Sequence, residues 1–251
     1  MAELIILGTA SAVPDKDHEN THFVLTGGQS AVLVDCVGND IVRLKQVGIE
    51  LDSINDIILT HCHPDHSSGI PSLLMSMWLL GRKANLNIYG LHHTMNCIEK
   101  MMDLYEWEDW PDFFPVAFHR VPVKEKALLL EAQTFRIFSS PVRHIVPTIG
   151  LRIESLQTGK VVAYSCDTEP CPQVVALARD ADVLIHEATG QSYGHSSAAQ
   201  AGEVAQNAGA KTLYLIHYPP HLYGAQDILD QAGMNFSGEV KFAQDFLKLA
   251  F

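Results

Sequence analysis

The sequence lacks a long apolar run and an excess of positive charge. No stretch of its 251 residues approaches the roughly 20 apolar residues that a membrane-spanning helix needs. The formal net charge is −12, and the Lys and Arg residues are scattered without forming a basic patch. We therefore expect no membrane partner, and this charge balance disfavours a nucleic-acid partner.

Cysteine is too sparse and too irregular to form a disulfide framework. The chain has five Cys, an odd number, at uneven spacing. The first residues include only a short apolar run without a basic segment before it, which predicts a first strand and no signal peptide. We therefore expect a reducing, cytoplasmic setting. Cys62 is expected to be a small buried residue.

Linkers, repeats and low-complexity segments are also missing from the sequence. Hydrophobic residues make up 47% of the chain and charged residues 18%, which is ordinary globular composition. A chain of this size buries enough apolar surface to fold without a disulfide or a structural metal. We expect a single domain that spans residues 1–251.

The most informative stretch is Thr60-His61-Cys62-His63-Pro64-Asp65-His66. It follows the apolar run 57–59, which predicts a buried strand, and it precedes an expected helix. In an extended loop His61 and His63 point the same way, whereas Asp65 and His66 lie where the chain turns into the helix. Three imidazoles and one carboxylate within six residues serve no packing need, and all four are zinc-ligand types.

Three later residues follow expected strands in the same way. His144 comes after the run 135–139, Asp167 after 161–164, and His217 directly after 212–216. Strand ends are where a rigid scaffold places reactive groups. We expect these three side chains to join the cluster at residues 61–66.

A second constellation lies between Asp167 and His217. The sequence His186-Glu187-Ala188-Thr189 ends an expected strand, and Gly194-His195-Ser196 opens the next helix. A carboxylate can orient an imidazole and raise its pKa, so we expect Glu187 to lie behind His195. Ser196 is also suited to be the N-cap of that helix, and His186 is expected to be structural.

Periodicity and turn residues predict a mixed α and β chain with strands dominating its middle. The expected strands cover residues 4–7, 22–26, 30–35, 57–59, 86–89, 116–121, 127–130, 135–139, 151–154, 161–164, 183–185 and 212–216, and the expected helices cover 39–46, 67–80, 92–105, 173–179, 197–208 and 227–232, with 240–246 as a terminal strand or turn.

With these motifs the chain resembles the metallo-β-lactamase superfamily, and within it the ribonuclease Z-like branch. The resemblance rests on the segment 60–66, on His144, Asp167 and His217 in that order, and on the motifs 186–189 and 194–196. It covers nearly the whole chain. It implies an α/β (α+β) fold in which two sheets pack face to face between helices, the four-layer αββα sandwich.

The resemblance also implies a pair of metal ions, each with an open position for chemistry. It assigns His61, His63 and His144 to one zinc, Asp65, His66 and His217 to the other, and Asp167 to both. Nitrogen and oxygen ligands also admit Mn²⁺ or Fe²⁺ in place of two Zn²⁺.

The implied reaction is metal-assisted hydrolysis, most readily of a phosphodiester. A hydroxide that bridges the two metals attacks, Asp65 orients it, and His195 serves the leaving group with Glu187 behind it. The alternatives are a tRNA 3′-processing endonuclease, another ester, sulfate or lactone hydrolase of the same fold, and a non-enzymatic metal-binding accessory protein.

The sequence departs from ribonuclease Z at three places. The tRNA-clamping arm is missing between His144 and Asp167, Pro219 and Pro220 stand where the branch has a Phe-Ser pair and a basic residue, and Cys166 replaces a Gly. Together with the negative charge, these differences favour a small-molecule substrate, a small phosphodiester, over a nucleic acid.

The segment 105–115 mixes acidic residues with large aromatics and two Pro. One interpretation is a loop that folds onto its own aromatic side chains. Another is a wall of the substrate cleft or the contact of a homodimer, since exposed aromatics favour interfaces. The sequence leaves both open.

Overall fold

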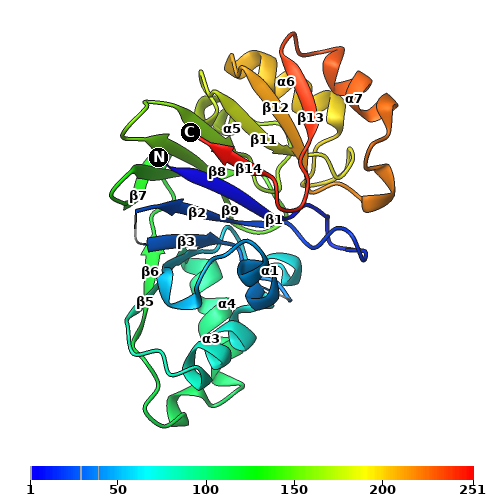
Figure 1. Ribbon diagram of the computed structural model, residues 1–251. Helices are drawn as coiled ribbons and strands as arrows, with labels where there is room; N and C mark the ends of the chain where they lie inside the picture. The colour runs from blue at the N-terminus through cyan, green and yellow to red at the C-terminus, as the bar shows by residue number, and fades with distance from the viewer. Residues whose placement is uncertain (1, 29, 39) are drawn as a thin grey trace.

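The computed structural model describes residues 2–28, 30–38 and 40–251. The strands form two seven-stranded sheets (Figure 1). In spatial order, the first sheet contains β14 (Lys248–Ala250), β1 (Glu3–Gly8), β2 (His22–Gly27), β3 (Ser30–Val34), β4 (Ile54–Ile58), β5 (Leu86–Leu91) and β6 (Val116–Val121). The second contains β13 (Glu239–Phe242), β12 (Thr212–Ile216), β11 (Val183–Glu187), β10 (Val161–Tyr164), β9 (Thr148–Ser155), β8 (Phe135–Val142) and β7 (Ala127–Glu131).

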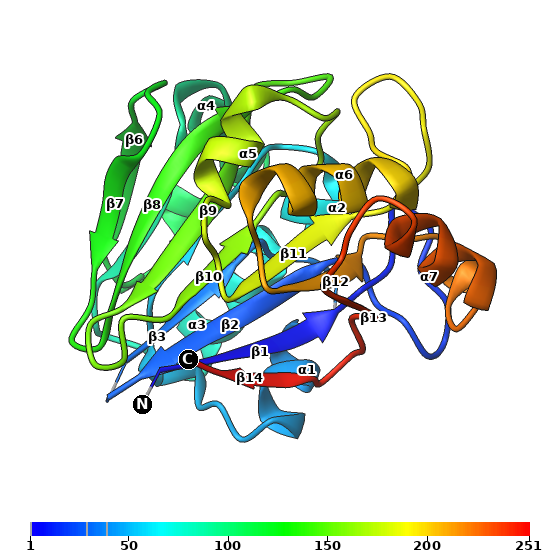
Figure 2. The same cartoon turned by 90° about the horizontal axis from the view of Figure 1, so that it is seen from above.

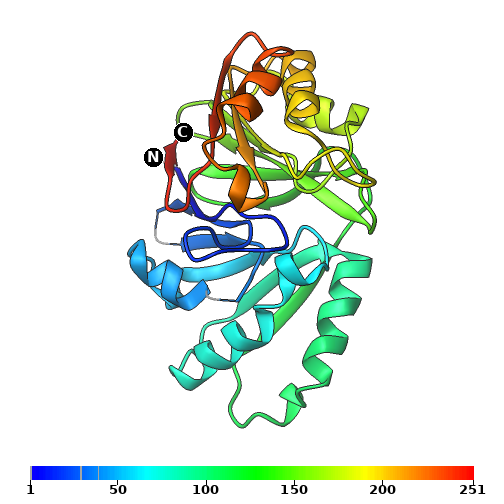
Figure 3. The ribbon, with the colours of Figure 1, turned by 90° about the vertical axis from the view of Figure 1, so that its right-hand side faces the viewer.

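Helices cover the outer face of each sheet, as Figure 3 shows from the side. The first sheet packs against α1 (Asp40–Gln46), α3 (Ile70–Leu79) and α4 (His92–Asp103), with the one-turn helix α2 (Pro64–Ser67) between β4 and α3. The second packs against α5 (Pro172–Leu177), α6 (Ala198–Ala208) and α7 (Gln226–Gly233), and Figure 2 shows α5 and α6 lying over its strands. Short 3₁₀ turns are η1 (Leu51–Ser53), η2 (Trp107–Asp109) and η3 (Pro220–Leu222).

The strands explain the layers, because many are apolar on both faces. Along β1, Leu4 and Ile6 belong to the core between the two sheets, whereas Ile5 and Leu7 belong to the core under the helices. A strand without a polar face needs cover on both sides. The four-layer αββα sandwich expected from the sequence is confirmed.

Strand direction brings several loops to one edge of the sandwich. In the first sheet β3, β4, β5 and β6 run parallel, and in the second β10, β11, β12 and β13 do the same. β8 runs parallel to β10, because both are antiparallel to β9, which lies between them. The segments that follow β4, β8, β10, β11 and β12 therefore emerge on the same side of their sheets.

Several element boundaries differ from the sequence-based expectation. The helix expected over 67–80 begins at Ile70 instead, because the Gly69 N–H donates to the Cys36 carbonyl at 2.9 Å and Ser67 ends the separate one-turn helix α2. The carboxyl-terminal segment forms two strands, β13 and β14, instead of one strand or turn over 240–246. Asn39, the expected first residue of the helix over 39–46, lies outside the described residues.

The aromatic segment 105–115 folds onto its own side chains. Trp110 stacks on Trp78 of α3 at 5.1 Å, and Trp107 and Phe113 meet edge to face. α4 begins at the edge where β5 ends and carries the chain about 18 Å along its axis before this segment starts. This position supports the packed-loop interpretation over a wall of the cleft, while a homodimer contact stays a prediction. Among the described residues, no helix combines the length and the apolar character that crossing a membrane requires.

Candidate metal centre

The loop after β4 is fixed by a buried carboxylate at the end of the neighbouring strand β3. Asp35 accepts hydrogen bonds from the Thr60 backbone N–H, at 2.8 Å, and from the Thr60 hydroxyl. Pro64 then starts α2, and the His66 N–H donates to the His63 carbonyl at 3.0 Å. The histidines of the segment are therefore held between a strand end and a helix start, as the sequence predicts.

Three imidazoles converge on one point of this edge. The His63 Nδ1 atom lies 3.1 Å from His61 Nε2 and 3.1 Å from His144 Nε2. His61 Nδ1 faces the Thr60 hydroxyl, which itself donates to Asp35, and His144 Nδ1 donates to the Gly194 carbonyl. These partners place the proton on Nδ1 in both rings, so both Nε2 lone pairs face inward.

A second group lies beside the first. His66 Nε2 and His217 Nε2 are 3.2 Å apart, and Asp65 Oδ2 lies 3.4 Å from His217 Nε2. His66 Nδ1 donates to Asp35 Oδ2, and His217 Nδ1 donates to the Thr189 hydroxyl, which donates to the His217 carbonyl. Again the outward nitrogens are held by protein partners, and the two Nε2 atoms face each other across the site.

Asp167 lies between the two groups with one oxygen toward each. Its Oδ2 atom is 3.9 Å from His61 Nε2 and 3.8 Å from His144 Nε2. Its Oδ1 atom is 3.5 Å from the Nε2 atoms of both His66 and His217, and it is buried without a hydrogen-bond partner. A buried carboxylate oxygen without a donor, facing nitrogen lone pairs, calls for a cation.

The charge states suit metal binding. Burial lowers the pKa of His61 well below its ordinary value and also lowers that of His63 and His144, so these imidazoles are neutral. Burial raises the pKa of Asp167, but the His217 and His66 imidazoles outweigh it and hold that pKa well below its usual range. Neutral imidazoles around an ionised carboxylate are the forms that bind divalent metals. The donor set therefore fits such ions.

Glu187 and His195 lie together at the mouth of this centre, as expected. The fully buried Glu187 carboxylate is 3.1 Å from His195 Nδ1 and accepts hydrogen bonds from the backbone of Thr168, Thr189 and Ser196. Burial lowers the pKa of His195, but the hydrogen bond with Glu187 and the charge of its carboxylate outweigh burial and raise this pKa overall. The raised pKa favours the protonated form of His195, whose ring lies beside His144 with ring centroids 4.9 Å apart.

Two details of this region differ from the sequence-based expectation. The N-cap of α6 is Ser197, which forms a capping box with Gln200, so the expected cap at Ser196 was wrong. Ser196 instead donates to the Thr168 carbonyl. The role of Thr189 in orienting His217 was missed, although Thr189 belongs to the motif 186–189, because the pairing of β11 with β12 is not visible in the sequence.

Two hollows of about 520 Å³ each flank the centre. One is lined by His144 and the residues around it, from Pro141 to Pro147. The other is lined by His195 together with residues of the segments 169–170 and 191–193. A substrate that extends in both directions from the imidazole cluster has room on either side.

Comparison with known proteins places these features in a family. A family model described as the beta-lactamase superfamily domain matches residues 30–218. Ribonuclease Z of Methanothermobacter thermautotrophicus is 32% identical, over 94% of this chain and 92% of its own length. Two crystal structures share the fold. The metallo-beta-lactamase fold protein YhfI from Bacillus subtilis has a TM-score of 0.81 and 23% identity, and the match covers 99% of this chain and 98% of that one. The short form of human tRNase Z has a TM-score of 0.77 and 24% identity, and the match covers 99% of this chain and 98% of that one.

The relatives named ribonuclease Z and tRNase Z contradict the expectation of a small-molecule substrate and a disfavoured nucleic acid. That expectation was wrong, and its weakest step was the use of net charge. A sum of −12 over the molecule does not fix the field at one edge of it. Two divalent cations at this centre would reverse the sign of that field locally.

Proposed function

The chain belongs to the ribonuclease Z-like branch of the metallo-β-lactamase superfamily and is a metal-dependent hydrolase, and from this premise we propose that it hydrolyses a phosphodiester bond of RNA at a pair of zinc ions. The observation that carries the proposal is the position of Asp167, with one carboxylate oxygen toward each of two imidazole groups. Precursor tRNA is the first substrate to test, because one structural relative is named a tRNase Z.

In this proposal His61, His63 and His144 hold one zinc, Asp65, His66 and His217 hold the other, and Asp167 bridges them. The inward-facing Nε2 atoms of four imidazoles support this assignment, together with the unpartnered Asp167 oxygen. Zinc suits a set of His nitrogens and carboxylate oxygens that leaves a position open. Mn²⁺ or Fe²⁺ accept the same ligand types.

Bound zinc would supply a water of lowered pKa and hold the phosphate oxygens. Asp65 is placed to orient that water. Burial raises the pKa of the Asp65 carboxyl, but its hydrogen bond with His217 outweighs it, and the pKa falls to about 2. Asp65 is therefore ionised at neutral pH and accepts a hydrogen bond or a proton from the attacking water.

His195 is the proposed general acid. Glu187 accepts from its Nδ1, so the Nε2–H is free to donate to the oxygen that leaves phosphorus. Glu187 itself touches no substrate and is a positioning residue, held by three backbone N–H groups. His195 would then protonate the ribose oxygen whose bond to phosphorus breaks, while Asp65 serves the opposite side, where the water attacks.

The substrate surface differs from that of an enzyme with a clamping arm. Residues 145–166, between His144 and Asp167, contain β9, the turn 156–160 and β10, with no inserted domain. RNA would therefore be bound by the loops around the centre and by the two hollows beside His144 and His195. We expect binding to weaken with added salt, since phosphate contacts release counterions.

The test uses the zinc-loaded protein and a precursor tRNA that carries a 3′ trailer. We expect endonucleolytic cleavage that stops after chelation and in Asp65→Ala, and a rate that falls roughly 10²- to 10⁴-fold in His195→Ala. His221→Ala is the matched control, since His221 lies in η3 outside the cluster, and it should cleave normally.

Two outcomes would overturn the proposal. Cleavage by metal-free protein would remove the metal centre from the reaction. Turnover of bis-p-nitrophenyl phosphate without cleavage of either precursor tRNA or single-stranded RNA would remove RNA as the substrate.

Glu187→Gln should shift the alkaline limb of the pH–rate profile to lower pH, an effect that a purely structural role would not produce.

A further inference from the structure

A second cluster of ligand-type side chains lies behind the metal-binding loop. β4 and β5 pair in parallel, with Ile57 opposite Ile88 and Ile58 opposite Tyr89, so the segments that follow them leave the sheet side by side. The first segment carries Cys62, and the second is α4, which carries His93 and Cys97. Strand pairing thus brings residues from two loops to one place.

The side chains on α4 are spaced for joint binding. His93 and Cys97 are four residues apart, so they lie on the same face of the helix. His93 Nε2 and Cys97 Sγ are 3.9 Å apart. The ligand atoms of Cys62, His93 and Cys97 all lie within 4.8 Å of one another.

These separations are close to those of a bound zinc. Bonds of about 2.3 Å to sulfur and about 2.0 Å to nitrogen in tetrahedral geometry put a sulfur and a nitrogen about 3.5 Å apart. The observed 3.9 Å between Cys97 Sγ and His93 Nε2 needs only a small side-chain adjustment to reach that value. Among the described residues, the side-chain partners of His93 and Cys97 all belong to the cluster itself, so neither has to give up an outside partner.

The cluster is separate from the centre formed by the seven His and Asp ligands. Side chains alternate along an extended segment, so Cys62 points away from His61 and His63. The two sulfurs and one nitrogen of this second cluster also form a softer ligand set than the nitrogens and carboxylate oxygens of the first centre. Cys62 and Cys97 are half-buried and His93 is exposed, so an ion can enter from solvent. The sequence-based expectation of a simply buried Cys62 is corrected here.

We propose that Cys62, His93 and Cys97 form a further metal site, for a thiophilic divalent cation such as Zn²⁺. Each thiol releases a proton as its sulfur–metal bond forms, the imidazole binds in its neutral form, and a water takes the fourth position. The bound ion ties the loop of His61 and His63 to the first turns of α4. This inference does not depend on the proposed RNA substrate.

The test is Co²⁺ binding by the reduced, full-length protein after removal of metals. We expect the wild type to show a thiolate-to-cobalt charge-transfer band and to bind one equivalent more than Cys97→Ser. The band should be lost in Cys97→Ser and in Cys62→Ser, and His93→Ala should bind the last equivalent more weakly. His92→Ala is the matched control: His92 neighbours His93 but bonds to Asn96, so this variant should behave like the wild type.

The contrary results are specific. If the reduced wild type shows no thiolate-to-cobalt band, the proposed site is overturned. This holds also if Cys62 and Cys97 are found to form a disulfide on oxidation but bind no metal. A band that persists in Cys97→Ser also overturns it, since another thiol such as Cys166, 3.7 Å from His61 Nδ1, would then be the source. Equal stoichiometry in the wild type and Cys97→Ser does the same. None of these readouts requires RNA cleavage.

Discussion

At the scale of single residues, the centre is organised by what lies behind each imidazole. The outward nitrogen of each of four rings hydrogen-bonds to one partner, which fixes both the proton and the orientation of that ring. The partners are Thr60, Asp35, Gly194 and Thr189. Partners of this kind set metal affinity nearly as strongly as the ligands themselves. Asp35 stands out, because it serves His66 directly and His61 through Thr60.

We predict that Asp35→Asn lowers zinc affinity by roughly 10- to 100-fold without unfolding the protein. The amide cannot provide two acceptor oxygens, so His66 would lose its partner or move its proton to the inward nitrogen. Competition with a chromophoric chelator measures the affinity. Asp56→Asn is the control, because Asp56 bonds to Asn87 and Tyr89 elsewhere on the sheet, and an equal loss there would contradict the prediction.

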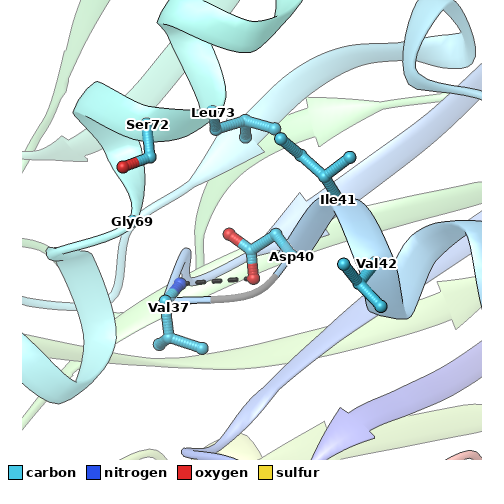
Figure 4. A pocket seen from close by; sticks show the side chains of 8 residues that line it. Val37, Asp40, Ile41, Val42, Gly69, Ser72 and Leu73 are labelled. Atoms are coloured by element: carbon cyan, nitrogen blue, oxygen red, sulfur yellow. Dashed lines mark hydrogen bonds between the residues drawn. The ribbon is translucent and has the colours of Figure 1, made fainter.

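Asp40 is a buried carboxyl group outside the metal centre, and Figure 4 shows it at the wall of a small pocket, with Val37 donating to it. Its other oxygen accepts from the Cys36 thiol. His22 Nδ1 donates to the Asn20 carbonyl, so the Nε2 lone pair faces Asp40 Oδ1 at 3.1 Å. A protonated Asp40 supplies the donor that this buried nitrogen needs.

Stability should therefore depend on pH through Asp40. Burial raises its pKa from 3.8 to about 7, while its hydrogen bond with Cys36 opposes the shift. A raised folded pKa gives stability that is complete below pH 3.8 and lost as pH rises through about 7, on the order of a few kcal/mol. Burial lowers the pKa of the facing His22 to about 3. The stability that neutral His22 contributes is therefore lost as pH falls toward 3, opposite to the effect of Asp40.

We predict that Asp40→Asn removes the loss of folding stability between pH 4 and 8, because the Asn amide donates a hydrogen bond to His22 throughout this range. Urea unfolding of both proteins across this range measures it, and the difference in free energy should grow with pH. Glu19 and Asp35 add negative charge nearby, which disfavours the ionised form of the Asp40 carboxyl and contributes to its raised pKa. A difference that stays constant with pH would contradict the prediction.

At the scale of elements, the sequence predicted which segments are strands and helices better than where they meet. The apolar strands and the positions of His144, Asp167 and His217 after them follow from local pattern, since alternation and turn residues are local properties. The break between α2 and α3 does not follow from local pattern, because it depends on a hydrogen bond from the Gly69 N–H to the distant Cys36 carbonyl. β14 was missed for a similar reason: three residues become a strand only because β1 is there to pair with them.

The contact between α6 and α7 is set by a glycine. A Cβ at Gly202 would lie 2.1 Å from the Ala232 carbonyl oxygen, and backbone cannot move aside as a side chain can. We predict that Gly202→Ala costs about 1–3 kcal/mol of stability in denaturant unfolding.

Gly233 in α7 provides the matched comparison for Gly202. An added methyl group there meets nothing within 4 Å, so Gly233→Ala should be neutral or stabilising by up to about 1 kcal/mol. Equal effects of the two substitutions would show that helix propensity, and not the contact between the helices, determines the result.

At the scale of the whole molecule, the proposed metal ligands come from both sheets. The segment 61–66 follows β4 of the first sheet, whereas His144, Asp167 and His217 follow β8, β10 and β12 of the second. A filled centre thus adds bonds across the sandwich at one edge. The sequence predicts the proposed ligand types and their order, but their convergence requires the two sheets to pack together. That residues 1–251 form a single domain stays a prediction.

Metal removal should therefore lower the melting temperature of the entire fold. With zinc at about a thousand times its Kd, binding adds about 4 kcal/mol, which corresponds to roughly 10 °C for a chain of this size. Calorimetry with and without chelator measures it. Asp167→Ala should melt lower and respond little to chelator, and an unchanged wild-type melting temperature would contradict the prediction.

The pairing of β14 with β1 has a consequence for synthesis. Until residues 248–250 have left the ribosome, the edge of β1 that they cover presents bare amides beside Leu4 and Ile6. An exposed, apolar strand edge is a template for pairing with other chains. A nascent polypeptide made only as far as β13 would then be prone to aggregate, and dependent on chaperones, until residues 248–250 emerge and pair with β1.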